Sequence, residues 1–154
     1  MTLLLVRHAD AGDRAAWTGD DLDRPLSAKG REQSQALAAL HAERHLDVIL
    51  SSPARRCIDT VTPLAEPRQL PVERAEALAE GAAFEELDRL LTRFAIQDAL
   101  LCSHADVIGA ALTALWRRGH LPERPNPRKV ATWLVEGGWP DPNRVELLAP
   151  PGAG

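Results

Sequence analysis

Two hydrophobic patterns alternate along this chain: short apolar runs, and longer segments in which apolar residues recur at helical spacing. The short runs predict buried strands at residues 2–7, 47–52, 70–75 and 99–103. The longer segments predict helices at residues 28–45, 53–65, 83–95 and 107–119. Residues 130–136 and 144–149 flank the turn-rich stretch GGWPDPN, so we expect them to pair as a hairpin or as neighbouring edge strands.

Local residues mark the first two helices. Ser27 is a good N-cap for the first helix, and Pro53 suits the first turn of the second. The stretch HAERH at 41–45 ends the first helix with two histidines four residues apart. Zinc proteases use that spacing with a glutamate directly after the first histidine, but Ala42 holds that place here. We therefore expect both histidines on the polar face of an amphipathic helix.

Strands that alternate with helices predict an α/β fold for this chain. The expected architecture is a single domain over residues 1–154, built as a three-layer α/β/α sandwich with a mostly parallel central sheet. In sheets of this kind, functional side chains gather beyond the carboxyl ends of the strands. This rule directs attention to the residues that directly follow each predicted strand.

Arginine and histidine residues end or closely follow three of the predicted strands. Arg7 and His8 end the first predicted strand, Arg56 falls in the first turn after the second, and His104 follows the fourth. Each alone has an ordinary structural explanation, such as a solvated arginine or a core histidine. Their joint position at one edge of the sheet makes a shared pocket the better interpretation, with Ser51 and Ser52 ending the second strand beside it.

Two arginines and two histidines suit chemistry at a phosphoryl group. The planar fork of arginine matches phosphoryl oxygens, and a neutral imidazole can attack phosphorus. A second histidine can donate to the same oxygens, and the helix that follows the second strand adds backbone N–H groups. We therefore expect His8 to attack phosphorus while its neighbour Arg7 holds the oxygens, with no metal in the site.

Charge and composition argue against several classes of protein. The net charge of −4 argues against a nucleic-acid-binding protein. No apolar run reaches membrane-spanning length, and residues 2–6 are too short for a secretory signal, so we expect a cytoplasmic protein with no membrane partner. Cys57 and Cys102 form no CxxC pair and are expected as buried free thiols. The Pro- and Arg-rich stretch 120–129 is expected to be a solvated loop.

Four segments, in order from Leu3 to about Ala114, resemble the histidine phosphatase superfamily, also called the phosphoglycerate mutase-like family. They are LLLVRHADAG, RPLSAKGREQSQAL, ILSSPARRCIDTVTPLA and LLCSHADVIGAAL. The short chain, with no large insertion after the second strand, looks most like the SixA-type phosphohistidine phosphatases. The resemblance implies a phosphoglycerate mutase-like fold.

The resemblance also implies roles for individual residues. His8 would be the phosphorylated nucleophile, Arg7 and Arg56 phosphate ligands, and His104 the second histidine of the pocket. Counting back from Thr60 selects Arg56 as the second arginine. The implied activity is a metal-independent, cofactor-free phosphatase acting on phosphomonoesters or protein phosphohistidine. The expected partner is thus a small phosphorylated substrate or a phosphohistidine protein. The alternatives are phosphoglycerate mutase-type transfer and a phosphate-binding module without turnover.

The acid that protonates the leaving group is less clearly marked. One branch of the family uses a glutamate after the third strand, and Glu80 stands at about that place. The other branch uses an aspartate directly after the second histidine, where this chain has Ala105 followed by Asp106. We favour Glu80, and Asp10, Asp13 and Asp106 are the other candidates.

Overall fold

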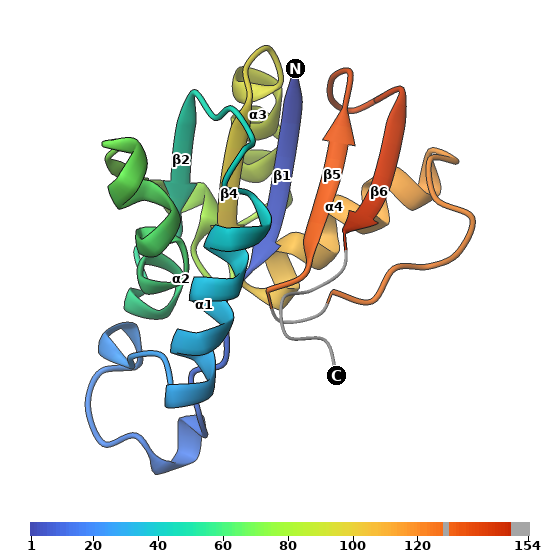
Figure 1. The fold of residues 1–154 in the computed structure, drawn as a ribbon. Helices are drawn as coiled ribbons and strands as arrows, with labels where there is room; N and C mark the ends of the chain where they lie inside the picture. The colour runs from blue at the N-terminus through green and yellow to red at the C-terminus, as the bar shows by residue number, and fades with distance from the viewer. Residues whose placement is uncertain (128–129, 149–154) are drawn as a thin grey trace.

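The computed structural model describes residues 1–127 and 130–148, which form a sheet with helices on both faces (Figure 1). The strands are β1 (Thr2–Arg7), β2 (Val48–Ser51), β3 (Val72–Arg74), β4 (Ala99–Ser103), β5 (Thr132–Glu136) and β6 (Arg144–Leu148). The α-helices are α1 (Ala28–Leu40), α2 (Arg55–Ala65), α3 (Phe84–Phe94) and α4 (Ala105–Arg117). Short 3₁₀ helices include η1 (Arg14–Ala16), η2 (Asp21–Asp23), η3 (Glu66–Arg68) and η4 (Glu76–Leu78).

The six strands lie in the order β3-β2-β4-β1-β5-β6. β3, β2, β4 and β1 run parallel to one another, and β5 pairs antiparallel with both β1 and β6. The predicted α/β class with a mostly parallel sheet is therefore confirmed. The expected pairing of the last two strands is also confirmed, although Arg128, Lys129 and Ala149 lie outside the described residues.

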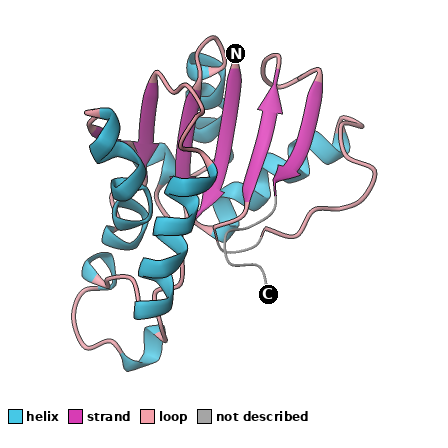
Figure 2. Ribbon diagram, in the orientation of Figure 1, coloured by secondary structure: helices cyan, strands magenta, loops and turns pink. Residues whose placement is uncertain are grey.

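Alternating side chains of the sheet build two apolar layers, because successive residues of a strand point to opposite faces. Leu3, Leu5 and Leu101 pack with apolar residues of α3 and α4, whereas Leu4 and Leu100 pack with α1 and α2. Figure 2 shows the two pairs of helices on opposite sides of the strands. The predicted three-layer sandwich follows from this division.

Both cysteines belong to the layer under α1 and α2. Cys57 of α2 and Cys102 of β4 are fully buried and free, as predicted. None of the helices in the described part of the chain is long and apolar enough to cross a bilayer.

The first helix ends earlier than predicted. α1 stops at Leu40 rather than near residue 45, because the side chain of His41 turns into the core. Its Nε2 lies 3.0 Å from Thr132 Oγ1, and the residue is only 1% exposed. Arg68 donates to the carbonyl oxygens of His41 and Arg44, which stabilises the chain where the helix stops. The expectation that His41 lies on a polar helix face was wrong.

The second helix begins later than predicted. α2 starts at Arg55, and Ala54 is its extended N-cap, so Pro53 lies before the first turn. Arg56 nevertheless falls in that first turn, as predicted.

The sheet register brings three strand ends together. Arg7, the last residue of β1, pairs with Ser103, the last residue of β4. Ser51, the last residue of β2, pairs with Cys102. The residues that directly follow these strands therefore leave the sheet at one edge, from which the loop between β1 and α1 extends away from the strands (Figure 1).

Candidate active site

A pocket of about 360 Å³ opens at the carboxyl ends of the parallel strands. Arg7, His8 and His104 line it, and Arg56 is buried behind it in contact with His104. The structure thus brings together the four side chains that the sequence grouped. The remaining lining residues are Ala11, Gly12, Arg14, Arg24, Glu80, Ala105 and Asp106.

The imidazole of His8 is held in one tautomer by its own neighbour. Its Nδ1 lies 2.7 Å from the carbonyl oxygen of Ala9, which can only accept, so Nδ1 carries the proton and Nε2 keeps its lone pair. The pKa of His8 is lowered to about 3, mainly by burial and to a smaller extent by the nearby His104, Arg56 and Arg7, while the hydrogen bond to Ala9 acts in the opposite direction. The ring is therefore neutral near pH 7, which is the form that can act as a nucleophile.

His104 meets His8 edge to face, with ring centroids 5.4 Å apart and planes at 68°. Arg56 Nη2 lies 3.4 Å from Nδ1 of His104, and arginine can only donate. Nδ1 is therefore the acceptor, and Nε2–H donates to Ser52 Oγ at 2.8 Å. Ser52, directly after β2, thus orients the second histidine of the pocket.

The two arginines expected to bind phosphate differ in their surroundings. Arg56 is 1% exposed, and its Nη1 donates to the carbonyl oxygen of Asp21 at 2.9 Å. Arg7 donates from Nη1 to the carbonyl oxygen of Pro127, and burial lowers its pKa. Within the described residues, Nε of each arginine is buried without a hydrogen-bond partner. Both guanidinium groups therefore retain donors for an anion.

Residues of the RPLSAKGREQ segment hold the chain after His8 in place. The backbone N–H of Asp10 donates to Gln33 Oε1 at 2.9 Å, and Ser27 Oγ donates to Asp10 Oδ2 at 2.6 Å. A Cβ at Gly30 would lie 1.9 Å from the carbonyl oxygen of Asp10, so only glycine allows this close approach. This part of the sequence therefore acts on the pocket by fixing the loop that follows the histidine.

Two of the four candidate acids line the pocket. Glu80 and Asp106 do so, whereas Asp10 binds Ser27 and Asp13 caps the 3₁₀ helix η1. The carboxylate of Asp106 accepts a hydrogen bond of 2.8 Å from the backbone N–H of Gly81. Glu80 therefore lies on a backbone that Asp106 anchors.

The Glu80 carboxylate is paired with two arginines. Arg14 Nη2 lies 2.9 and 3.0 Å from its two oxygens, and Arg56 Nη2 lies 3.2 Å from Oε2. The hydrogen bond from Arg14 lowers the pKa of Glu80, and the charges of His104 and Arg56 act in the same direction. In this state Glu80 is a carboxylate rather than an acid.

Sequence reasoning missed three charged residues of the loop between β1 and α1. Arg14 and Arg24 line the pocket, and Asp21 contacts Arg56. Arg24 donates to the carbonyl oxygen of Ala11 at 2.7 Å and pairs with Asp21 at 3.0 Å. Arg24 begins the RPLSAKGREQ segment, so the resemblance of that segment could have indicated it, whereas no pattern in the sequence marks Arg14 or Asp21.

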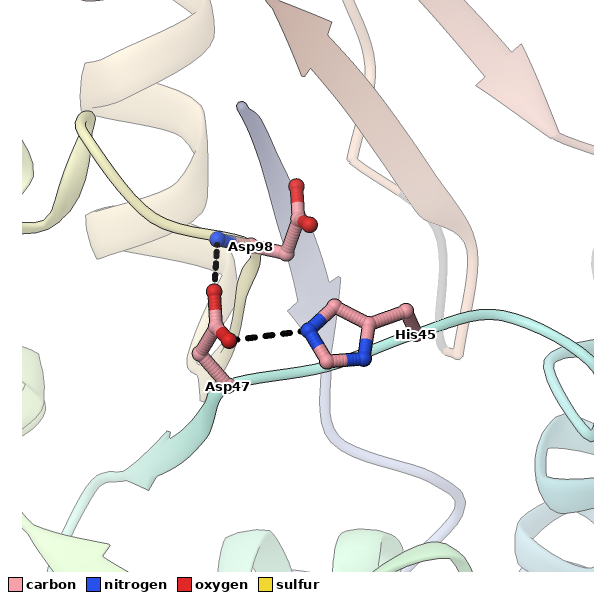
Figure 3. Close-up of side chains that lie close together, drawn as sticks. All are labelled: His45, Asp47 and Asp98. Carbon is pink, nitrogen blue, oxygen red and sulfur yellow. Dashed lines mark hydrogen bonds and ion pairs between the residues drawn. The ribbon is translucent and has the colours of Figure 1, made fainter.

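A cluster of three side chains of the kinds that can bind metal ions lies at the opposite edge of the sheet. One ligand atom each of His45, Asp47 and Asp98 lies within 4.8 Å of the others (Figure 3). Asp47 accepts from the backbone N–H of Asp98, and Asp98 accepts from that of Thr2. These bonds join the beginnings of β2, β4 and β1, so the cluster has a structural role and no contact with the pocket residues.

The chain is similar in sequence to known phosphatases. The model of the histidine phosphatase superfamily (branch 1) matches residues 3–85. The chain is 30% identical over 158 residues to the 8-oxo-(d)GTP phosphatase of Mycolicibacterium smegmatis, covering 97% of this chain and 48% of that protein. It is 37% identical over 79 residues to phosphoserine phosphatase 1 of Hydrogenobacter thermophilus, covering 51% of this chain and 37% of that protein. The chain therefore spans half or less of the length of each of these relatives.

A solved structure of the protein histidine phosphatase SixA, complexed with tungstate, has the same fold. Its TM-score against this chain is 0.74 at 19% identity, and the match covers 97% of this chain and 95% of that one. A mycobacterial glucosyl-3-phosphoglycerate phosphatase matches with a TM-score of 0.65 at 19% identity, covering 95% of this chain and 96% of that one. Both likenesses concern the fold.

Proposed function

Because this chain belongs to the histidine phosphatase superfamily, as its sequence indicated, we propose that it is a metal-independent phosphatase that works through a phosphohistidine on His8. The observation that carries the proposal is the state of His8: neutral, with Nδ1–H bound to Ala9 and Nε2 free to attack. The substrate class is a phosphomonoester or a protein phosphohistidine.

In the first step, the lone pair of His8 Nε2 attacks phosphorus in line with the leaving group. The N–P bond forms as the bond from phosphorus to the leaving oxygen or nitrogen breaks, and an acid supplies the proton that the leaving atom takes up. Arg7, Arg56 and His104 stabilise the charge on the equatorial oxygens. His104 donates to them from Nδ1 after that atom has taken a proton from the bound phosphoryl monoanion.

In the second step, water hydrolyses the phosphohistidine. The water oxygen attacks phosphorus, one of its protons passes to the carboxylate that served as the acid, and the N–P bond breaks to restore His8. Inorganic phosphate leaves. We assign the acid and base role to Glu80, because its side chain lines the pocket and contacts Arg56. Asp106 is the alternative, although its carboxylate already binds the Gly81 amide.

Two other functions use the same residues. A phosphoglycerate mutase would return the phosphoryl group to a second hydroxyl of a sugar acid instead of passing it to water. A binding module would hold phosphate without turnover. The neutral tautomer of His8 favours catalysis over simple binding, because a binding site gains more from a protonated imidazole.

A substrate panel tests the proposal. It should contain p-nitrophenyl phosphate and an alkyl phosphate as general substrates. Phosphoserine, nucleoside phosphates and a phosphohistidine protein complete it, because the similar proteins are phosphatases of these classes. We expect release of inorganic phosphate from at least one member and none from a His8→Ala variant. Tight phosphate binding without turnover of any member would favour the binding module.

A further inference from the structure

Four charged side chains form a closed ring that includes two residues of the pocket lining, Arg14 and Glu80. Arg56 Nη2 lies 3.2 Å from Asp21 Oδ2, and Asp21 Oδ1 lies 3.5 Å from Arg14 Nε. Arg14 Nη2 lies 2.9 Å from Glu80 Oε1, and Glu80 Oε2 lies 3.2 Å from the starting Arg56 Nη2. Two positive and two negative charges therefore alternate around the ring.

The residues of the ring differ in how deeply they are buried. Arg56 is fixed on α2 with a side chain 1% exposed, whereas the side chains of Arg14 and Glu80 are 59% and 44% exposed. Arg14 begins the 3₁₀ helix η1, whose N-cap is formed by Asp13. The exposed pair Arg14–Glu80 is therefore the part of the ring that can move when an anion arrives.

A phosphoryl group bound to Arg56 competes with Glu80 for the same guanidinium. A dianion brings more charge than one carboxylate and takes up several N–H donors, so it displaces Glu80 Oε2 from Nη2. Without another anchor, the displaced side chain would lose its orientation towards the leaving group. Arg14 supplies that anchor, because it holds both oxygens of the carboxylate rather than one.

We propose that Arg14 is the positioning residue of the leaving-group acid, holding Glu80 beside the scissile bond after the phosphoryl group has displaced it from Arg56. The inference rests on the proposed function, because it assigns Glu80 a proton to give. Asp21 supports the arrangement from the other side, since its carboxylate contacts both Arg14 and Arg56.

The charges around Glu80 explain how a carboxylate becomes an acid. Arg14 contributes most to stabilising its ionised form, His104 and Arg56 add to this, and Asp21 and Asp106 are the nearby negative groups. When a phosphoryl dianion displaces Glu80 from Arg56, the carboxylate loses a positive partner and gains a negative neighbour. Both changes raise the pKa of Glu80. Arg14 then keeps the protonated carboxyl in place.

Variants of Arg14 test the proposal. Arg14→Gln should lower kcat on an alkyl phosphate by about tenfold or more, because a displaced general acid loses much of its effect. It should change kcat on p-nitrophenyl phosphate by less than about twofold, because that leaving group needs little protonation. Arg14→Lys keeps the charge and should recover part of the loss. Arg118→Gln removes a different exposed arginine, which pairs with both carboxylate oxygens of Asp141, and should leave both rates unchanged.

A second measurement tests the contact between Arg14 and Glu80 directly and needs no substrate turnover. The pKa of Glu80, measured by carbon-13 NMR in the free protein, should rise in Arg14→Gln and stay unchanged in Arg118→Gln. Equal losses on both substrates, or an unchanged Glu80 pKa, would overturn the role of Arg14 while leaving the phosphatase assignment intact. Absence of turnover by the wild-type protein would overturn the proposed function and this inference with it.

Discussion

The Nδ1 atom of His8 donates a 2.7 Å hydrogen bond to the carbonyl oxygen of Ala9, the residue that follows it in the chain. The backbone of Ala9 is itself held, because its N–H donates to Thr60 Oγ1 at 2.9 Å, and that hydroxyl donates to the carbonyl oxygen of Arg56. One short chain of bonds thus links the ring of the expected nucleophile to the helix that carries the expected phosphate ligand.

The first prediction concerns His8 as the site of phosphorylation. Rapid quench during turnover should trap an acid-labile, base-stable phosphoenzyme, and peptide mapping should place the label on His8. His8→Ala should lose the label and nearly all turnover. His45→Ala, at the opposite edge of the sheet, should keep both. Label on Cys57 or Ser51 would contradict the mechanism and leave only the fold.

Arg56 should matter far more than its neighbour Arg55. Arg56→Ala removes a buried donor for the phosphoryl oxygens, and the loss of one charge-stabilising donor costs about a hundredfold or more in kcat. Arg55 is 57% exposed and pairs with Asp59, so Arg55→Ala should change the rate little. Arg56→Lys keeps the positive charge, and a thermal melt of each variant shows whether it is still folded. Together they distinguish a loss of catalysis from a loss of folding. A greater loss in Arg55→Ala would show that the wrong arginine had been chosen.

Glu80 and Asp106 can be separated by the leaving group. Glu80→Gln should slow an alkyl phosphate by about a hundredfold, the lower end of what general acid catalysis contributes, and slow p-nitrophenyl phosphate much less. Asp106→Asn should weaken the bond to the Gly81 amide and have a smaller effect without that dependence on the substrate. Steady-state rates on the two substrates decide the matter, and the reverse pattern would assign the acid to Asp106.

Chelators should leave activity intact. The pocket is built from arginines and histidines that bind oxygen anions, and the cluster of His45, Asp47 and Asp98 lies at the other edge of the sheet. We expect the same kcat before and after dialysis against EDTA. Activity that is lost on dialysis and restored by one added metal would refute the metal-independent mechanism.

Acid should destabilise the protein through two buried histidines. Burial lowers the pKa of His8 to about 3 and that of His41 to about 4, both below the ordinary value of 6.5. Below pH 6.5 these histidines bind protons in the unfolded chain but stay neutral in the folded chain. The free energy of unfolding therefore falls as the pH falls towards 4. Each histidine contributes at most about 1.4 kcal/mol per pH unit.

Denaturant unfolding of His41→Gln isolates one of these contributions. The difference from wild type at pH 8 measures the lost contact with Thr132. Between pH 6.5 and 4 the variant should lose less stability per pH unit than wild type, because glutamine does not titrate. Parallel curves over that range would mean that His41 is not buried in its neutral form.

The order of strands and helices followed from local patterns in the sequence. Short apolar runs end in Arg7 and at Ser103, next to His104, and the parallel arrangement implied by the alternation brought these positions to one edge. The helical stripe of α3 predicted its limits to within one residue at each end. Such features depend on neighbours within a few residues, so periodicity is enough to reveal them.

The limits of α1 and the surroundings of Glu80 were decided by the tertiary structure. The sequence pattern continued to residue 45, but the helix ends at Leu40, where His41 contacts Thr132 and Arg68 binds the carbonyl oxygen of His41 just beyond the helix. Glu80 was found by its place in the chain, yet its partner Arg14 lies 66 residues away. No local pattern encodes an ion pair between two loops, because its geometry exists only after the sheet has set where each loop begins.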